Sequence, residues 1–282
     1  MSTKTDEMLR EGYEAYRRYV NPLVTLRAEL LGEPTHVTAI DAGRLVEPRG
    51  LVEDFHGTQT FGHRHPAITA AVTEFLGSDS PNWFPCRVNP YAGLLAKRLC
   101  ERANTTLEGP RPAYSNVFFA NSGSGAVEAA IKLARAATKK PRVLSLDGAY
   151  HGCTMGSNAL MKPGMFKDPF GPHVPGLAPI PFGDIDALVT ALRGGEVAAV
   201  VLEPIQLEGG VRPVPSAFLE VACELTAKHG ALLVADEIQT GLGRTGRFLA
   251  SEAWPRRPDA VILGKHLGGG LVPISAMLTT DE

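Results

Sequence analysis

The 282-residue sequence lacks a long apolar run, since no stretch reaches the ~18 residues that a membrane-spanning helix requires. Its N-terminus, MSTKTDEMLREGYEAYRRYV, carries charged side chains throughout and contains no apolar signal-peptide segment. Cysteine is also scarce: Cys86, Cys100, Cys153 and Cys223 are far apart and form no C-x-x-C pair. This spacing argues against a disulfide framework or a zinc site, so we expect a cytoplasmic protein without a metal.

An excess of basic charge is absent as well. The chain has 28 lysine and arginine residues against 30 aspartate and glutamate residues, a formal net charge of −2. That balance provides no basic field for binding nucleic acid. The glycine-rich segment QTGLGRTG at 239–246 does not open a helix, as the glycines of a dinucleotide fingerprint do, and it lacks the G-K-[ST] ending of a P-loop.

From about residue 114, apolar β-type runs alternate with stretches of helical spacing. Several runs are apolar on consecutive residues, which is typical of strands covered by helices on both faces. The pattern predicts a three-layer α/β/α domain with a mostly parallel sheet, and a long loop at the Pro/Gly-rich stretch 163–181. The expected strands are 116–120, 142–146, 197–205, 231–238, 259–265 and 274–278, and the expected helices are 125–137, 185–193 and 217–230.

The N-terminal part of the chain is organised differently. Helical spacing occurs at 5–20, 66–76 and 90–103. The first of these stretches is either a helix or a mobile arm. Residues 36–55 predict two or three short strands of a small separate sheet. We therefore expect an N-terminal arm and small-sheet segment at 1–55 and a large domain at 56–282.

In a parallel sheet, ligands bind beyond the carboxyl ends of the strands, so the residues after each expected strand are informative. After 116–120 the chain reads NSGSG, and Gly123 and Ser124 open a helix whose free N–H groups can hold a phosphate. A serine-capped turn is the alternative. After 142–146 comes Tyr150, which either stacks on a planar ligand or is a half-buried loop residue.

Acidic residues occur near the ends of two further strands. Asp236 ends the apolar run ALLVAD, where a buried carboxylate needs a cationic or hydrogen-bonding partner. It is therefore a ligand-binding residue, a structural ion pair or a helix cap. Glu203 and Glu208 lie in the segment EPIQLEGG and can position a substrate, although Glu208 also suits a solvated loop.

Lys265 follows the apolar run PDAVIL, in the sequence GKHLGGG. Partial removal from water favours the neutral, nucleophilic form of a lysine amine, whereas most lysines lie on the surface. The combination is more informative than any single residue, because each group follows a different strand of one sheet. This set of groups matches the needs of pyridoxal 5'-phosphate (PLP). Its phosphate requires a helix N-terminus, its ring an aromatic side chain to stack on, its ring nitrogen a carboxylate and its aldehyde a lysine.

From about residue 20 to its end, the sequence resembles the class III aminotransferases of the ornithine, acetylornithine and ω-amino-acid type. These are PLP-dependent enzymes of fold type I. The segments that carry the resemblance occur in the family's order: FFANSGSGAVEAAIKLAR, YHG, EPIQLEGG, ADEIQTGLGRTG and PDAVILGKHLGGGLVPISAML. The spacing between Asp236 and Lys265 is also similar to the family's.

The resemblance implies a role for each residue at the expected cofactor ring. Lys265 would form the Schiff base with the cofactor and then carry the proton of the 1,3-shift. Asp236 would pair with the pyridine N–H, and Gln239 would lie near the ring hydroxyl. Tyr150 would stack on the ring face, with His151 beside it.

The resemblance also implies phosphate and substrate contacts. Gly123 and Ser124 would hold the phosphate. Glu208 resembles the glutamate that masks a carboxylate-binding arginine when an ω-amino substrate is bound, and Glu203 would support the site from its strand end. A homodimer is implied too, because the family's sites lie at the subunit interface.

The sequence departs from the family's pattern at several positions. Gly125 replaces an acidic residue, and Val127 stands where asparagine is common, so side-chain contacts to the phosphate are expected to be lost. His266 follows the lysine where a small residue is usual, and it either perturbs the Lys265 amine, crowds the loop or points into solvent. The chain also ends soon after Lys265, so we expect the family's C-terminal small domain, with its substrate-binding arginine and phosphate-binding threonine, to be absent.

These observations predict a PLP-dependent aminotransferase that moves an amino group from an (ω-)amino donor to a 2-oxo acid. The expected mechanism is ping-pong, with glutamate and 2-oxoglutarate as one substrate pair. Two alternatives remain open. One is a related PLP-dependent decarboxylase or aminomutase that shares Lys265 and Asp236. The other is a truncated or split chain that binds PLP and needs a second polypeptide for activity.

Overall fold

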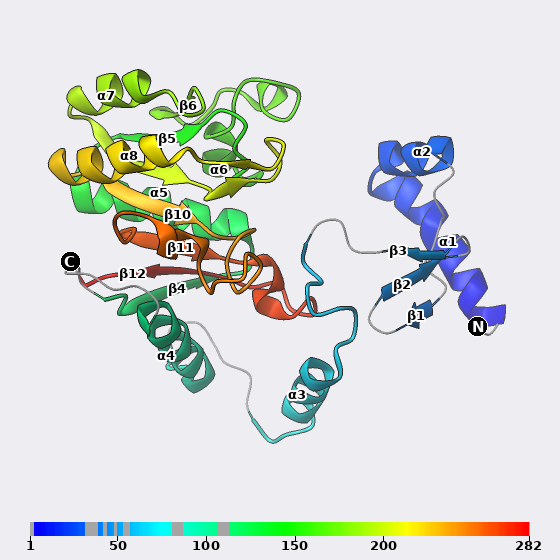
Figure 1. The fold of residues 1–282 in the computed structure, drawn as a ribbon. Helices are drawn as coiled ribbons and strands as arrows, with labels where there is room; N and C mark the ends of the chain where they lie inside the picture. Colours follow the sequence, from blue (N-terminus) through cyan, green and yellow to red (C-terminus); the bar gives the residue numbers. More distant parts are fainter. Residues whose placement is uncertain are drawn as a thin grey trace. The chain divides into compact units, whose positions relative to one another are not determined.

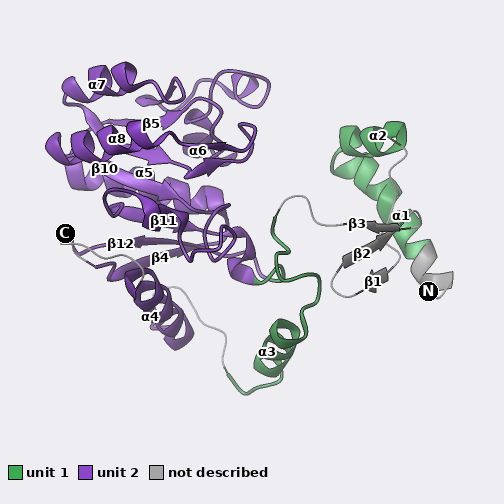
Figure 2. Ribbon diagram, in the orientation of Figure 1, with its two compact units in different colours: residues 1–80, 269–271 green, residues 81–268, 272–282 purple. Residues whose placement is uncertain are grey.

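The computed structural model describes residues 3–31, 39–41, 44–47, 50–52, 57–80, 87–105 and 113–281. The chain forms two compact units, residues 1–80 with 269–271 and residues 81–268 with 272–282 (Figure 2). Each residue singled out above for the site lies in the second unit. The domain boundary expected at residue 55 stays a prediction.

The first unit contains helices and a small antiparallel sheet. Its helices are α1 (Thr3–Tyr19), α2 (Pro22–Leu31) and α3 (Pro66–Leu76), and its strands are β1 (Ala39–Asp41), β2 (Arg44–Glu47) and β3 (Gly50–Val52), in the order β1-β2-β3. Of the two alternatives for residues 5–20, the structure has the helix, and the expected short strands within 36–55 are confirmed. An ion pair of 3.0 Å between Arg17 and Glu29 joins α1 to α2.

The second unit is built on a seven-stranded sheet, with the order β4-β12-β11-β10-β7-β5-β6 (Figure 1). Its strands are β4 (Asn116–Ala120), β5 (Arg142–Leu146), β6 (Leu177–Ile180), β7 (Val197–Leu202), β10 (Leu232–Asp236), β11 (Ala260–Leu263) and β12 (Ser275–Thr279). β12 is antiparallel to both neighbours, and the other pairs of neighbouring strands are parallel. The carboxyl ends of the parallel strands therefore meet at one edge, where β12 begins.

Helices cover both faces of this sheet. They are α4 (Pro90–Thr105), α5 (Gly123–Thr138), α6 (Met155–Ala159), α7 (Ile185–Arg193) and α8 (Ser216–Lys228), with 3₁₀ turns at Asp168–Phe170, Ala250–Ala253 and Lys265–Gly268. Leu144 and Leu233 pack on the face that includes Phe218 of α8, whereas Val143 and Val234 pack on the face of α5. Since successive side chains of a strand point to opposite faces, the consecutive apolar residues fill two cores. The three-layer α/β/α prediction is confirmed.

Two short elements near the sheet differ from the sequence-based prediction. The expected loop 163–181 contains β6, which pairs only with β5 at the sheet edge, where a proline such as Pro179 is tolerated. The strand expected at 197–205 ends at Leu202. A small hairpin of β8 (Ile205–Gln206) and β9 (Arg212–Pro213) follows it. Among the described residues, no helix has the length and apolar character needed to cross a membrane.

Candidate functional site

The carboxyl edge of the large sheet gathers the residues that the sequence singled out. Gly123 and Ser124 follow β4, Tyr150 and His151 follow β5, Glu203 and Glu208 follow β7, Asp236 ends β10 with Gln239 after it, and Lys265 follows β11. These strands share one direction, so segments far apart in the sequence reach the same edge.

A buried pair of His151 and Asp236 lies at the centre of this edge. The His151 Nδ1 atom is 2.7 Å from the Asp236 Oδ2 atom, and the two residues are 1% and 3% exposed. The other carboxylate oxygen of Asp236 accepts the backbone N–H of Ile238 at 3.1 Å. Because an ionised carboxylate can accept about four hydrogen bonds, Asp236 retains capacity for one more donor.

The Asp236 carboxylate favours the charged form of His151. Burial by itself lowers the pKa of His151, but the hydrogen bond and charge of Asp236, together with the charge of Glu203, outweigh burial and raise that pKa. The sequence predicted only that His151 lies beside Tyr150. Its contact with Asp236 joins residues 85 positions apart in the sequence.

Glu203 is a second buried carboxylate of the site, 6% exposed. Burial raises its pKa to about 7, the charge of Asp236 adds to this effect, and the charge of His151 and the N–H of Tyr150 oppose it. That N–H donates to the Oε1 atom of Glu203 at 2.8 Å. Glu203 therefore holds the backbone of the loop that presents Tyr150. Glu208 is exposed, and its charge contributes to the raised pKa values of Glu203 and Tyr150.

The substitution Glu203→Gln is expected to change how stability depends on pH. The pKa of Glu203 rises from 4.5 to about 7 on folding, so the folded chain keeps a proton that the unfolded chain releases in this interval. Stability therefore falls as pH rises from about 4.5 to 7, by on the order of 3 kcal/mol at about 1.4 kcal/mol per pKa unit. Urea unfolding across this range should show that this decline is absent in Glu203→Gln.

The exposed Glu220 of α8 offers the control for this experiment. Glu220→Gln should follow the pH profile of the unaltered chain. An equally steep decline in Glu203→Gln would show that Glu203 is not the group that keeps the proton.

Tyr150 is joined to the N-terminus of α5 through Cys153. The Tyr150 hydroxyl is 3.1 Å from the Cys153 Sγ atom, and the Cys153 N–H donates to the Ser124 Oγ atom at 3.2 Å. The hydrogen bond with Cys153, followed by partial burial, raises the pKa of Tyr150 to about 12. Tyr150 is 42% exposed, so its neutral ring is accessible to a planar ligand.

The N-terminus of α5 is capped and closely packed. The Ser122 side chain accepts the Gly125 N–H at 3.1 Å, and the Ser275 hydroxyl donates to the Ser122 carbonyl at 2.6 Å. A Cβ atom at Gly123 would lie 2.7 Å from the Ile238 side chain. Val127 is fully buried within the core, so this departure from the family's pattern does not face the phosphate cup.

Lys265 starts a 3₁₀ turn directly beyond β11, on the strand next to the one that ends at Asp236. Its φ of 48° lies in the left-handed region, a strained conformation that a non-glycine residue adopts where function or packing demands it. The side chain is half-buried and forms no hydrogen bond or ion pair with the described residues. Its amine is therefore available to a ligand.

The residues beside Lys265 correct one expectation. His266 is 2% exposed, and its Nδ1 atom is 2.9 Å from the Arg244 guanidinium. It therefore does not point into solvent. Arg244 also donates to the backbone carbonyl of Gln239, and Gln239 is half-buried on the loop that follows Asp236. His266 and Gln239 are thus linked through one arginine.

Several contact residues of the site were missed in the sequence. Glu128 accepts hydrogen bonds from the Thr154 hydroxyl at 2.6 Å and from the Gly156 N–H at 2.7 Å, which fixes the loop after His151. Cys153 comes directly after YHG, and this place in the sequence is the signal that puts it within reach of Tyr150. Ser275 opens β12, and apolar patterning gives no signal for its hydrogen bond to Ser122.

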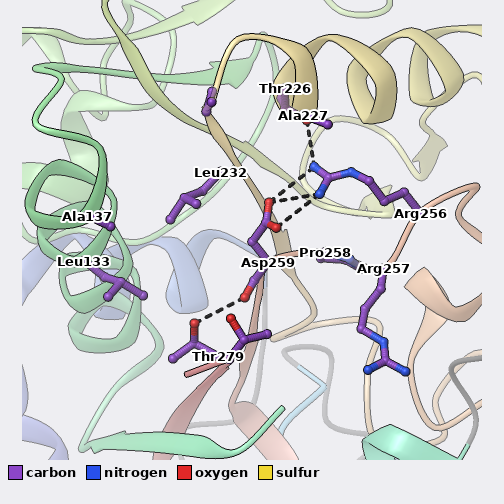
Figure 3. A pocket seen from close by; sticks show the side chains of 13 residues that line it. Leu133, Ala137, Thr226, Ala227, Leu232, Arg256, Arg257, Pro258, Asp259 and Thr279 are labelled. Carbon is purple, nitrogen blue, oxygen red and sulfur yellow. Dashed lines mark hydrogen bonds and ion pairs between the residues drawn. The ribbon is translucent and has the colours of Figure 1, made fainter. Parts of the chain in front are cut away.

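A cavity of about 550 Å³ lies at the opposite end of the strands (Figure 3). Arg256 pairs with Asp259 at 3.1 Å and donates to the Thr226 hydroxyl at 2.8 Å, and Asp259 accepts the Leu233 N–H at 2.7 Å. None of the site residues predicted from the sequence lines this cavity. Its charged groups bind the loop before β11 to β10 and α8, which is a structural arrangement. Among the described residues, no cluster suited to a metal ion occurs.

The side chains at the carboxyl edge fit PLP. A capped helix N-terminus, an accessible aromatic ring, a buried carboxylate with spare hydrogen-bonding capacity and a lysine with an unpaired amine correspond to its four functional groups. With the seven-stranded sheet, they define a PLP-binding domain of fold type I.

The particular family follows from comparison with known proteins. Residues 55–282 match the class-III aminotransferase family, and the chain belongs to that family. An ornithine aminotransferase from Toxoplasma gondii ME49 is 31% identical, with a TM-score of 0.77 over 86% of this chain and 58% of the other. A PLP-bound amine transaminase from an uncultivated Pseudomonas species is 28% identical, with a TM-score of 0.74 over 87% of this chain and 61% of the other.

A third similar structure is the taurine:2-oxoglutarate aminotransferase from Bifidobacterium kashiwanohense, in complex with PLP and glutamate. It is 27% identical, with a TM-score of 0.74 over 87% of this chain and 59% of the other. The chain thus spans about three fifths of the length of these three proteins.

Proposed function

We propose that this chain binds PLP covalently through Lys265 and takes part in moving an amino group from an amino donor to a 2-oxo acid. The observation that carries the proposal is the buried pair of His151 and Asp236, 2.7 Å apart. Asp236 ends β10, which lies next to β11, the strand that leads to Lys265. A buried carboxylate beside a lysine with an unpaired amine is the arrangement that PLP chemistry needs.

When bound, PLP supplies an electrophilic carbonyl and a ring that withdraws electrons from the substrate. Lys265 would provide the nucleophilic amine and would carry the proton that leaves the α-carbon of the amino donor. Asp236, held by His151 and the Ile238 N–H, would accept a hydrogen bond from the pyridine N–H and favour its protonated form. Gln239 would lie near the ring hydroxyl.

Other residues would hold the cofactor in place. Tyr150 would pack against the ring face, and its hydrogen bond with Cys153 limits rotation of the tyrosine side chain. The N–H groups at the start of α5, with Gly123 and the Ser124 hydroxyl, would hold the phosphate dianion, which the positive end of the helix dipole favours.

For the substrates, we propose an (ω-)amino donor and the glutamate/2-oxoglutarate pair, used in a ping-pong sequence. Glu208 supports this choice because it is exposed at the tip of the hairpin, yet close enough to influence Tyr150 and Glu203. An acidic side chain at that place attracts an amine and repels a carboxylate unless a cation neutralises it. We further propose a homodimer in the cytoplasm.

Glutamate conversion tests the proposal directly. The purified chain is titrated with PLP, and the visible absorption band of lysine-bonded PLP is recorded. Glutamate alone is then added, and up to one equivalent of 2-oxoglutarate should be released per bound PLP, because the first half of a ping-pong reaction needs no acceptor. If the band forms but no 2-oxoglutarate is released, only the cofactor-binding part of the proposal stands. If no band forms, the whole proposal is wrong.

A further inference from the structure

Arg212 lies on β9, the second strand of the hairpin that carries Glu208 at its tip. One guanidinium nitrogen, Nη2, donates to the Asp147 carbonyl at 2.8 Å and to the Gln206 Oε1 atom at 2.7 Å. The guanidinium also lies 4.2 Å from the centre of the Phe182 ring. Arg212 thus contacts the loop after β5, its own hairpin and the loop after β6.

Two glycines make room for this guanidinium. A Cβ atom at Gly148 would lie 2.1 Å from the Arg212 Nη2 atom. A Cβ atom at Gly209 would lie 3.0 Å from the same nitrogen and 2.6 Å from the Gln206 Oε1 atom. Both loops therefore lack a side chain at the position that Arg212 occupies, which indicates a specific fit.

Among the residues that the structure describes, no carboxylate pairs with Arg212. Its hydrogen bonds go to a backbone carbonyl and to the amide of Gln206, which is 1% exposed. The planar face of the guanidinium packs on an aromatic ring. Lysine cannot reproduce this combination, because it has neither the planar face nor the fixed directions of the N–H groups.

We infer that Arg212 is a positioning residue that joins the loop of Tyr150 to the hairpin of Glu208. The loop begins at Asp147, which Arg212 holds directly, and three residues later the Tyr150 N–H is held by Glu203. Two hydrogen bonds from the segment 203–212 therefore fix the first half of the loop, at Asp147 and at Tyr150. The inference rests on the proposed function, since Tyr150 and Glu208 are there assigned to the cofactor ring and the substrate.

The test compares PLP affinity in Arg212→Met and Arg212→Lys. In both variants the dissociation constant for PLP, measured from the visible band during titration, should rise about tenfold, which corresponds to ~1.4 kcal/mol. Gly209→Ala should shift it in the same direction, because the added methyl group would lie 3.0 Å from the Arg212 Nη2 atom and 2.6 Å from the Gln206 Oε1 atom while Arg212 itself is unchanged. Thermal unfolding of each variant without PLP shows whether the chain is folded.

Arg135 provides a matched control. It also donates to two backbone carbonyls, those of Pro141 at 2.9 Å and Pro175 at 2.7 Å, but near the amino ends of β5 and β6. Arg135→Met should lower the melting temperature and leave the dissociation constant for PLP within twofold of that of the unaltered chain. A purely structural role of Arg212 would give this same pattern.

A double-mutant cycle shows whether Arg212 acts through Tyr150. In the Tyr150→Ala background, Arg212→Met should add little to the loss of PLP affinity. Three outcomes would each overturn the inference. They are an equal loss of PLP affinity from Arg212→Met with and without the Tyr150 ring, an unchanged PLP affinity in Arg212→Met, and a normal PLP affinity in Arg212→Lys. If the unaltered chain gives no PLP band, the proposed function fails and the inference fails with it; a normal band in the unaltered chain and in Arg212→Met overturns the inference alone.

Discussion

The variant Lys265→Ala is expected to lose the visible band of lysine-bonded PLP and to transfer amino groups at least about 10⁴-fold more slowly, the upper value for losing a general base. The reason is that, in the proposed function, Lys265 is both the nucleophile and the proton carrier. Its side chain is half-buried and has no partner among the described residues, so removing it breaks no contact of the fold. The melting temperature should therefore stay close to that of the unaltered chain.

Borohydride reduction with peptide mapping gives an independent readout of Lys265. In the unaltered chain, reduction should fix one PLP group on the peptide that contains Lys265, and in Lys265→Ala it should fix none. Lys162, an exposed lysine of the same compact unit, offers the control, and Lys162→Ala should retain both the band and the label. A label at another lysine, or normal turnover without Lys265, would contradict the assignment.

The variant Asp236→Asn is expected to bind PLP but to transfer amino groups at least about 10³-fold more slowly than the unaltered chain. A decrease of this size is typical when one preorganised electrostatic contact is removed from an active site. Asparagine keeps the shape of the side chain and can still bind His151. It lacks the negative charge that holds the proton on the ring nitrogen, so the ring accepts electrons less readily. The phosphate cup and Lys265 are unchanged, so cofactor binding should persist.

The neighbouring carboxylate Glu237 is the matched control for Asp236. It is 1% exposed, but it binds the Thr240 hydroxyl and the Ser251 N–H instead of His151. Glu237→Gln should lower stability and spare the transfer rate per folded chain. A near-normal rate in Asp236→Asn would remove the role assigned to this aspartate.

Asp236→Asn should also change the pH dependence of stability. The charge of Asp236 helps to raise the pKa of His151 above its unfolded value of 6.5. The ion pair therefore stabilises the unaltered chain fully below pH 6.5, and this contribution is lost as pH rises through the raised pKa. The stability difference between the two chains should shrink at high pH, and a constant difference would contradict this account.

The sheet was predictable where local sequence and burial agree. The strands at 116–120 and 142–146 and the helix at 185–193 have the predicted bounds, because apolar runs and helical spacing end there at turn residues. β6 was missed because Pro179 and the surrounding prolines and glycines favour a loop in sequence. Only pairing with β5 at the edge of the sheet makes this segment a strand.

The residue types of the site were also apparent from the sequence, whereas their partners were not. Asp236 was expected to need a cation or a donor, but the sequence contains no signal that selects His151, 85 positions away. The same holds for the hydrogen bond of Cys153 with Tyr150 and for the fit of Arg212 between Gly148 and Gly209. Such contacts depend on which strands are neighbours and on where each loop turns.

The sequence by itself determined the layered α/β class, the family and the residue types at the candidate site, because apolar patterning and reactive residue types are local properties of the chain. The tertiary structure alone decided the raised pKa values of His151 and Glu203, the burial of His266 and the position of Arg212. These properties depend on the removal of charges from water and on distances between strand ends. Both arise only when the sheet order β11-β10-β7-β5 brings the loops together at one edge.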